Sequence, residues 1–546
     1  MDSIELLHRD FVFLSNKKAF FILSLLSDSR YFGLFFRYKD YYIKILDRIE
    51  NKKVDKKKVK KIILEDSNIV KLYYENDIYE RYILLDDKLV YETNVISNLV
   101  PFFDIKHIYD TDEWGRNYNF EIFDNYIKIN FSKGDINLSV FLSGYLEYIE
   151  RGNKWVEIYY NYDYKRRSPP FNRWLYVPFE FKGKRLIVSL NKKFDYKIYK
   201  RDITFYDLLK DRLLSFSDGW ISAGYPWYFQ EWTRDILISL PAFYLIGEKE
   251  LVRKKLIEYK DIFLDCGKLR NIVNSNIGNC DSVFWYIKRL FEYKRLFNEE
   301  EFNRIVFDVK KYFDIYIDKF FDEEENLFFC YPNESWMDTL NRKYPIEIQF
   351  LAALSLKYMY EKFREEKYIK IYNKLIESIK KKYVFDNSLL DDIKNPSIRP
   401  NIFLSYYIYK DVFSKNDWEK FIDYSLRHLW LDWGGLSSIS KFDTRFKEEH
   451  NGDNFFNNDK SMHNGDSWIY LNNIAAIVMN DLNKEKYSRY IRKIFEASTS
   501  YLKEIGTLPE LSSAKNRDIS GAISQLWSLA TYIEMLKELN ININLL

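Results

Sequence analysis

A short stretch of the chain, residues 223–235, brings several aromatic rings next to an arginine and an aspartate. Trp232, Arg234 and Asp235 close this stretch, just before an apolar run with the character of a helix. Flat rings can cover the C–H face of a sugar, and a guanidinium beside a carboxylate can bind neighbouring hydroxyls. The stretch therefore predicts a sugar-binding site, with a buried aromatic cluster capped by a salt bridge as the alternative.

Two carboxylates further along the chain have the surroundings that acid–base chemistry requires. Asp338 follows a Ser-Trp-Met run in a loop, and apolar neighbours raise the pKa of a carboxyl group, as a general acid needs. Glu510 lies in a Gly…Pro turn at residues 506–511, near two leucines. Two carboxyl groups on separate loops are the minimum for hydrolysis of a glycosidic bond. Because the chain has 81 acidic residues, either one alone is better explained as an ordinary loop acid.

The elements that must position these residues change type along the chain. Residues 1–200 contain many short β-branched and aromatic runs bounded by turns, which predict an N-terminal antiparallel β-sandwich. Residues 201–546 have apolar side chains at intervals of three and four, which predict helices. The expected helices are 201–216, 234–247, 248–264, 281–295, 299–320, 345–363, 366–383, 400–410, 415–430, 465–480, 484–503 and 519–539.

About every second expected helix is entered through a polar and aromatic stretch, whereas the others begin with ordinary Lys/Glu-rich sequence. Such alternation favours a closed ring of helical hairpins, an (α/α)6 barrel, whose inner helices present their N-terminal ends at one mouth. An open α-solenoid of hairpins is the alternative. A solenoid gives no reason for motifs to gather at one end of alternate helices, so the barrel is the preferred prediction.

Seven motifs, in one order from about residue 220 to 530, resemble the glucosidase domain of glycogen debranching enzymes. That family is related to glucoamylases, whose W-T-R-D is matched by residues 232–235. The matching segments, each followed by its family counterpart, are 223–235 (A-G-Y-P-W-F-x-x-W-G-R-D), 335–338 (T-W-M-D), 345–349 (P-V-E-I-x), 399–401 (R-P-N), 462–468 (Y-H-N-G-x-V-W), 506–510 (G-x-L-P-E) and 525–528 (Q-A-W-S).

The resemblance implies an (α/α)6 glucosidase that acts with inversion of configuration. Asp338 falls on the family's general acid and Glu510 on its general base, and such carboxyl groups stand roughly 6.5–9.5 Å apart. The resemblance also implies substrate-binding positions, which are Trp232, Arg234, Asp235, Trp285, Trp336, Glu347, His463 and Trp468.

Several of these positions have simpler explanations, which stay open. Trp285 and Trp468 could be helix-packing core, and His463 could be a structural histidine. Glu347 could contact a hydroxyl, support the catalytic acids, or simply favour the N-terminus of its helix.

The predicted activity is exo-acting release of glucose from α-1,6 branch stubs of glycogen-like α-glucans. Thr233 replaces the glycine of debranching enzymes and agrees with glucoamylases, so a glucoamylase-like exo-α-1,4-glucosidase is the first alternative. A relative acting on trehalose or a glycosylated small molecule is another, and a non-catalytic glycan-binding protein is a third. Only the glucosidase half of a debranching enzyme is expected, because the residues before 200 are too few for a (β/α)8 barrel.

Composition and charge favour a cytoplasmic protein, and the resemblance implies that its partner is an α-glucan or oligosaccharide substrate. The net charge of +3, with both signs interspersed, implies no nucleic-acid partner. No apolar run reaches membrane-spanning length, and the first residues lack a basic signal-peptide start, so no membrane partner is expected. Cys266, Cys280 and Cys330 lack metal-ligand spacing and are expected to be free, buried thiols. We expect no metal and no organic cofactor, and the sequence leaves the oligomeric state open.

Overall fold

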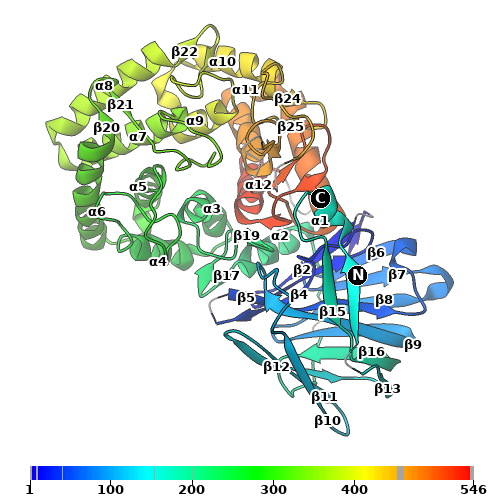
Figure 1. Cartoon of the computed structure of the whole chain (residues 1–546). Coiled ribbons are helices and arrows are strands. Elements are labelled where there is room, and N and C mark those ends of the chain that lie inside the picture. Colours follow the sequence, from blue (N-terminus) through cyan, green and yellow to red (C-terminus); the bar gives the residue numbers. More distant parts are fainter. Residues whose placement is uncertain are drawn as a thin grey trace. The chain divides into compact units, whose positions relative to one another are not determined.

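The computed structural model describes residues 3–7, 10–39, 41–152, 154–198, 201–451 and 460–541. The chain forms two compact units (Figure 1). The first contains Met1–Phe229 and Ser500–Leu508, and the second contains Gln230–Thr499 and Pro509–Ile541. The first is built mainly of strands, and the second mainly of helices.

Most helices follow the expected segments, but α12 begins at Leu526 rather than at residue 519, and the short helix α1 was not expected. Helix α11 is interrupted at Asn483, whose backbone is not helical (φ −163°, ψ 86°), and it therefore covers two of the expected helices. The helices are α1 (Asn161–Lys165), α2 (Phe205–Ser215), α3 (Thr233–Leu245), α4 (Lys249–Tyr259), α5 (Ser282–Glu292), α6 (Glu299–Phe320), α7 (Ile346–Phe363), α8 (Glu366–Lys382), α9 (Asn401–Tyr409), α10 (Lys415–Leu429), α11 (Ile469–Ile505) and α12 (Leu526–Glu538).

The helical unit is a ring of inner helices supported by outer ones (Figure 1). Helix α3 packs against α5 and α12, and α7 packs against α5 and α9. Helices α3, α9 and α12 are buried along most of their length, whereas α4, α6, α8 and α10 bury only part of theirs. A helix that is apolar all round belongs inside and an amphipathic one outside, so the sequence pattern itself sorts the two sets. The polar and aromatic stretches precede the inner helices.

Short strand pairs join many of these helices. They are formed by β17 (Ser217–Asp218), β18 (Trp220–Ile221), β19 (Gly224–Tyr225), β20 (Phe321–Asp322), β21 (Leu327–Phe328), β22 (Val384–Phe385), β23 (Ser388–Leu389), β24 (Trp430–Leu431), β25 (Gly435–Leu436), β26 (Ser467–Trp468), β27 (Leu511–Ser512), β28 (Ile519–Ser520) and β29 (Ser524–Gln525). Across the described ranges, no helix is both long and apolar enough to cross a lipid bilayer.

Two cysteines differ from the expectation of free thiols. Cys280 and Cys330 form a disulfide, with their Cα atoms 5.7 Å apart, and Cys266 is free. The loop before α5 and the loop after β21 meet only in the folded chain, 50 residues apart in sequence. The expectation is therefore wrong for Cys280 and Cys330, because spacing along the chain carries no sign of this contact.

Strands β1 to β16 of the first unit form one antiparallel sheet within the described residues. The longest strand, β9, pairs with β5, β8, β15 and β16, so it joins all parts of the sheet (Figure 1). The strands are β1 (Ile4–Leu6), β2 (Phe11–Ser15), β3 (Ala19–Ser24), β4 (Gly33–Tyr38), β5 (Tyr41–Asn51), β6 (Lys61–Asp66), β7 (Ile69–Tyr73), β8 (Tyr79–Leu84), β9 (Lys88–His107), β10 (Asn117–Ile122), β11 (Ile127–Lys133), β12 (Ile136–Ser143), β13 (Glu147–Glu150), β14 (Trp155–Tyr159), β15 (Asn172–Tyr176) and β16 (Phe179–Ser189).

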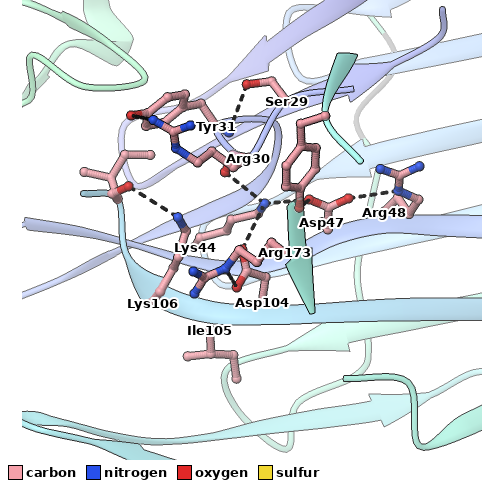
Figure 2. A network of polar contacts seen from close by, with 12 residues as sticks. Ser29, Arg30, Tyr31, Lys44, Asp47, Arg48, Asp104, Ile105, Lys106 and Arg173 are labelled. Atoms are coloured by element: carbon pink, nitrogen blue, oxygen red, sulfur yellow. Dashed lines mark hydrogen bonds and ion pairs between the residues drawn. The ribbon is translucent and has the colours of Figure 1, made fainter. Parts of the chain in front are cut away.

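A buried network of charges crosses this unit between β5, β9 and β15 (Figure 2). Lys44 Nζ lies 2.6 Å from Asp47 Oδ1 and 3.3 Å from Asp104 Oδ2. Arg173 Nε donates a 2.6 Å hydrogen bond to Asp104 Oδ1. Burial would raise the pKa of Asp104, but Arg173, Lys44 and Lys106 outweigh burial and hold that pKa well below its usual range. Asp104 is therefore the anion on which several buried cations depend.

We expect Asp104→Asn to lower the melting temperature of the first unit by at least about 6 °C in calorimetry of the full chain. The change leaves Lys44 and Arg173 buried without their carboxylate. Because folding depresses the pKa of Asp104, its contribution to stability is present above its unfolded pKa of about 3.9 and is lost as the pH falls below it. Asp86→Asn, at an exposed position, is the matched control. Equal melting temperatures for the two variants would contradict the expectation.

Candidate active site

Arg234 ties together three segments at the N-terminal ends of the inner helices. Arg234 and Asp235 lie in the first turn of α3, and both are buried. Arg234 Nε donates a 2.6 Å hydrogen bond to Asp281 Oδ2, and its Nη2 donates a 2.7 Å bond to the backbone carbonyl of Glu334. Asp281 precedes the first residue of α5. One guanidinium thus joins α3, α5 and the loop before α7.

Three carboxylates share the electrostatic field of this guanidinium. Burial would lower the pKa of Arg234, but Asp281, Asp235 and Asp338 raise it above its usual value. For Asp235, burial raises the pKa to about 7, Arg234 opposes the rise, and the other two carboxylates add to it. Gln525 Nε2 also donates a 3.3 Å bond to Asp235 Oδ1. Near neutral pH, Asp235 can therefore both donate and accept hydrogen bonds.

Asp338 is open to solvent, although residues 335–337 directly before it are buried. Protein atoms nevertheless surround its carboxyl group densely. This burial raises the pKa of Asp338, while Arg234 and Lys460 partly oppose the rise. The carboxyl group combines access with a raised pKa, which is what a general acid requires.

Glu510 is held by the backbone around it. Its side chain is buried, and Glu510 Oε2 accepts a 2.7 Å hydrogen bond from the backbone N–H of Ala522. The backbone carbonyl of Glu510 accepts a 3.2 Å bond from the N–H of Ile469, the first residue of α11. Gly521 has φ +68°, and a Cβ atom at this position would lie 2.4 Å from Glu510 Oε2. The position of the carboxylate therefore requires glycine at residue 521.

Five aromatic side chains form a compact cluster. The Trp336 ring lies 5.4 Å from the Trp468 ring and 5.5 Å from His463, centroid to centroid. His463 stacks on Trp468 at 5.1 Å. Tyr470 contacts Trp336 at 5.4 Å and stacks on Trp527 at 4.3 Å. The rings pack mainly edge to face, which is a favoured arrangement for aromatic side chains, and all five are buried.

This aromatic cluster connects the loops of the two carboxylates. Trp336 is two residues before Asp338. Trp468 lies opposite Leu511 in the β26–β27 pair, and Leu511 directly follows Glu510. The structure thus brings Asp338 and Glu510 to neighbouring loops on one side of the helical ring.

Buried polar atoms without a protein partner gather in the same place. Buried polar groups are nearly always hydrogen-bonded, so a concentration of exceptions marks a site that takes a polar ligand. Among the described residues, the atoms concerned are Asp281 Oδ1, His463 Nε2, Tyr470 Oη, Gln525 Oε1 and Trp527 Nε1.

Glu347 belongs to a buried network that holds the loop of Asp338, which we call the acid loop. Both of its carboxylate oxygens accept hydrogen bonds from Arg342, at 2.7 and 2.6 Å. Arg342 also bonds both oxygens of Asp391, at 2.8 and 2.7 Å. Asn401 donates to Asp391 at 2.6 Å and accepts a 2.8 Å bond from Trp336 Nε1. The network therefore fixes Trp336, and Glu347 supports that ring.

His463 is buried and neutral in this setting. Burial holds the pKa of His463 well below its usual value, and Arg399 and other nearby cations lower it further. Its Nδ1 lies 2.7 Å from Thr339 Oγ1, and Thr339 directly follows Asp338. The imidazole therefore contacts the loop of Asp338 through its edge, while one of its faces stacks on Trp468.

Two of the expected sugar-binding tryptophans lie differently from the others. Trp285 is 1% exposed within α5, and the guanidinium of Arg289 lies 5.3 Å from its ring centre. Trp232 is half-buried immediately before the first residue of α3. The role of both tryptophans in binding stays a prediction.

Sequence reasoning missed several residues of this site. Four had a usable signal. Asp281 and Arg342 lie in the polar stretches before α5 and α7, and Gln525 and Trp527 lie in the segment that resembles Q-A-W-S. Asp391 has none, because only its distant partners Arg342 and Asn401 give it a role. The missed residues are Asp281, Arg342, Asp391, Tyr470, Gln525 and Trp527.

We expect Gly521→Ala to displace the Glu510 carboxylate and to lower the hydrolytic activity that the motifs predict by about 100-fold. The added Cβ atom would occupy the space of Glu510 Oε2, and φ +68° is unfavourable for alanine. A crystal structure of the variant, together with glucose release, would measure both effects. Gly134→Ala is the control, because φ is also positive there but no atom lies within 4 Å of the added Cβ. An undisplaced carboxylate in Gly521→Ala would contradict the expectation.

One solved structure resembles the whole chain in fold. A bacterial glucoamylase complexed with acarbose has a TM-score of 0.67 and 11% sequence identity, and the match covers 100% of this chain and 96% of that one. This likeness confirms the predicted fold, an antiparallel β domain followed by an (α/α)6 helical domain. A mannosylglycerate hydrolase from Thermus thermophilus, in complex with Tris and D-glycerate, has a TM-score of 0.48 and 10% identity over 60% of this chain and 99% of that one.

Comparison with protein families identifies the family of the chain. None of the curated proteins matches the chain in sequence. The family model described as Amylo-alpha-1,6-glucosidase matches residues 215–534. The match spans more than half of the chain and contains the Arg234 cluster, both carboxylates and the aromatic cluster. The chain therefore belongs to the amylo-alpha-1,6-glucosidase family of glycoside hydrolases.

Proposed function

We propose that the protein is an exo-acting α-glucosidase that inverts configuration and releases glucose from α-1,6 branch stubs of glycogen-like α-glucans. One observation carries most of the proposal: five buried polar atoms without a protein partner lie among the neighbours of Arg234 and the aromatic cluster. A glucose unit has hydroxyls around its ring and apolar C–H faces. It can therefore satisfy scattered donors and acceptors while it lies on aromatic rings.

In the proposed reaction, Asp338 and Glu510 have separate tasks. Asp338 donates its proton to the glycosidic oxygen as the bond to the anomeric carbon breaks. Glu510 takes a proton from a water molecule, whose oxygen attacks the opposite face of that carbon. The products are a sugar hydroxyl and β-glucose. Asp338 is suited to the first task by its raised pKa and access, and Glu510 to the second by its fixed position.

Binding energy comes from the groups around the terminal glucose. Arg234 and Asp235 are proposed to bind adjacent hydroxyls, as a cation beside a carboxyl group that can donate or accept. Trp336 and Trp468 offer apolar faces to the ring. His463 acts through its contact with Thr339 and is proposed to hold the acid loop in place.

A glucoamylase-like exo-α-1,4-glucosidase is the second candidate, and two observations favour it. Thr233 is the residue of glucoamylases, and its Oγ1 lies 2.6 Å from the carbonyl of Arg270 and 3.1 Å from Ser282 Oγ. The similar bacterial glucoamylase was solved with acarbose bound and matches the whole length of this chain. The α-1,6 activity is preferred because the family model and the larger number of motifs are of the debranching type.

We expect Asp338→Asn and Glu510→Gln each to lower kcat/KM for an isomaltose-type substrate by about 10²–10⁴-fold, because each removes one proton transfer. Glucose release from isomaltose-type, maltose-type and phosphorylase-limit-dextrin substrates would be measured, with the anomer followed by NMR. The expected first product is β-glucose, mainly from α-1,6 stubs. Asp318→Asn, at an exposed position on α6, is the control and should keep full activity.

Other outcomes of the same measurement would replace the proposal. Release mainly from maltose-type chains would favour the glucoamylase-like activity. α-Glucose as the first product would exclude Glu510 as general base. Binding without release from any α-glucan would favour a non-catalytic glycan-binding protein.

We expect Lys460→Gln to move the alkaline limb of the kcat/KM profile to higher pH. The general acid must be protonated, so kcat/KM falls as the pH rises through the pKa of Asp338. Burial raises that pKa and Lys460 lowers it, so removing the Lys460 charge raises it further. Lys484→Gln, which changes an exposed lysine on α11, is the control for net charge. A shift to lower pH in Lys460→Gln would show that Asp338 does not govern this limb.

A further inference from the structure

The hairpin of β14 and β15 in the first unit has two unlike faces. One face carries Val156, Ile158 and Leu175, which pack in the apolar core of the unit. On the other face Trp174 lies opposite Glu157, and it is 44% exposed. An edge of a sheet that covers its core with one face normally turns short polar side chains to solvent on the other. Large rings on the outer face therefore call for an explanation.

The exposed rings continue along the hairpin. Tyr159 lies opposite Asn172 on the same face as Trp174 and is 51% exposed. Its ring centroid lies 6.2 Å from that of Tyr164, which is 59% exposed. These rings thus form a row that starts at Trp174 and passes Tyr159 to Tyr164.

At the other end the row reaches a loop between β9 and β10. Glu113 Oε1 accepts a 2.7 Å hydrogen bond from the backbone N–H of Trp174, and Arg116 Nη1 donates a 2.7 Å bond to the carbonyl of Trp174. Trp114 lies between these two residues in sequence and is 85% exposed. We call Trp114, Trp174, Tyr159 and Tyr164 the aromatic strip.

The loop that presents Trp114 is firmly held. Asp112 Oδ1 accepts a 3.0 Å bond from the N–H of Trp114. Lys133 Nζ donates to Asp110 Oδ2 at 2.6 Å, and the guanidinium of Arg116 lies 4.6 Å above the centre of the Trp155 ring. Trp114 is thus exposed on a fixed support, and exposed apolar patches of this kind mark interaction sites.

The polar groups along the strip indicate what it binds. Asn172 Nδ2 donates a 3.0 Å bond to Glu157 Oε1, and Glu113 pairs with Arg116 at 3.5 Å. The Glu113 carboxylate is therefore paired with a cation, whereas Glu157 keeps its charge and is held in place by the neutral amide of Asn172. The strip thus has fixed hydrogen-bond acceptors to which hydroxyl groups can donate. Its rings are planar, and amide and carboxyl groups lie beside them. This combination suits a neutral, polyhydroxylated chain.

We propose that the aromatic strip is a second carbohydrate-binding surface, which holds glycogen-like α-glucan chains by stacking of sugar rings on Trp114 and Trp174. The identity of the glucan rests on the proposed function. Binding at the strip keeps the enzyme on a branched polymer between cleavage events and takes no part in bond cleavage.

The test measures glycogen binding apart from hydrolysis. In native gels that contain glycogen, the full chain with Asp338→Asn should be retarded. Adding Trp114→Ala and Trp174→Ala should weaken the apparent affinity by about tenfold. Leu146→Ala, which truncates a 73% exposed side chain in the same unit, should leave retardation unchanged. With Asp338 intact, the strip variants should hydrolyse short oligosaccharides as well as the unsubstituted chain and should show a raised KM for glycogen only.

The outcomes separate this proposal from the proposed function. Unchanged retardation in the double variant, or equal loss in Leu146→Ala, would overturn the strip. If the double variant lost self-association but was retarded as before, the proposal would also be wrong. The aromatic strip would then be an interface between copies of the chain. If the double variant misfolds, Trp114→Ala alone can be tested instead, because that side chain is exposed and its truncation should leave folding intact. Strip-dependent retardation without hydrolysis of any short α-glucoside would sustain the strip and overturn the proposed function.

Discussion

The helical unit depends on one buried cation, the guanidinium of Arg234. It joins the N-terminal ends of α3 and α5 to the loop before α7 through Asp281 and the carbonyl of Glu334. A buried charge is strongly unfavourable unless it is paired, and the partial positive charge of a helix N-terminus does not help a cation. Asp235 and Asp281 lie at just those N-termini and stabilise both the helix ends and the guanidinium. The interaction that joins the inner helices therefore also creates the field around Asp338.

A second buried cation, Arg342, holds the acid loop in place. Two buried carboxylates, Glu347 and Asp391, take most of its hydrogen-bonding capacity, and Arg399 lies 3.6 Å from Asp391. Two cations thus face two anions, so the group is close to neutral although it is buried. Removing any one of the four leaves an uncompensated charge, which makes the arrangement rigid against substitution. Asn401 carries that rigidity to the indole of Trp336 and hence to the loop of Asp338.

The helices and the main site could be predicted from the sequence for different reasons. Helix periodicity is local, so α6 (Glu299–Phe320) coincides with its expected bounds, and Asp338 and Glu510 were found through motifs. Contacts between distant residues leave no such trace. The Cys280–Cys330 disulfide, the role of Asp391 and the stacking of Tyr470 on Trp527 depend on which loops meet after folding. Whether Asp338 and Glu510 act as acid and base stays a prediction, because burial and hydrogen bonds establish suitability rather than reaction.

Tryptophan illustrates why residue type alone says little about a site in a chain with 19% aromatic residues. Trp285 is enclosed in the interior of α5 with a packed guanidinium, which is the setting of a core residue. Trp336 is equally buried, but Asn401 fixes its Nε1, and its ring lies beside polar atoms that lack protein partners. Trp114 is open to solvent on a braced loop. What separates the three is the surroundings of each ring: Trp336 lies beside polar atoms that a ligand could satisfy, Trp114 is open to solvent, and Trp285 is enclosed.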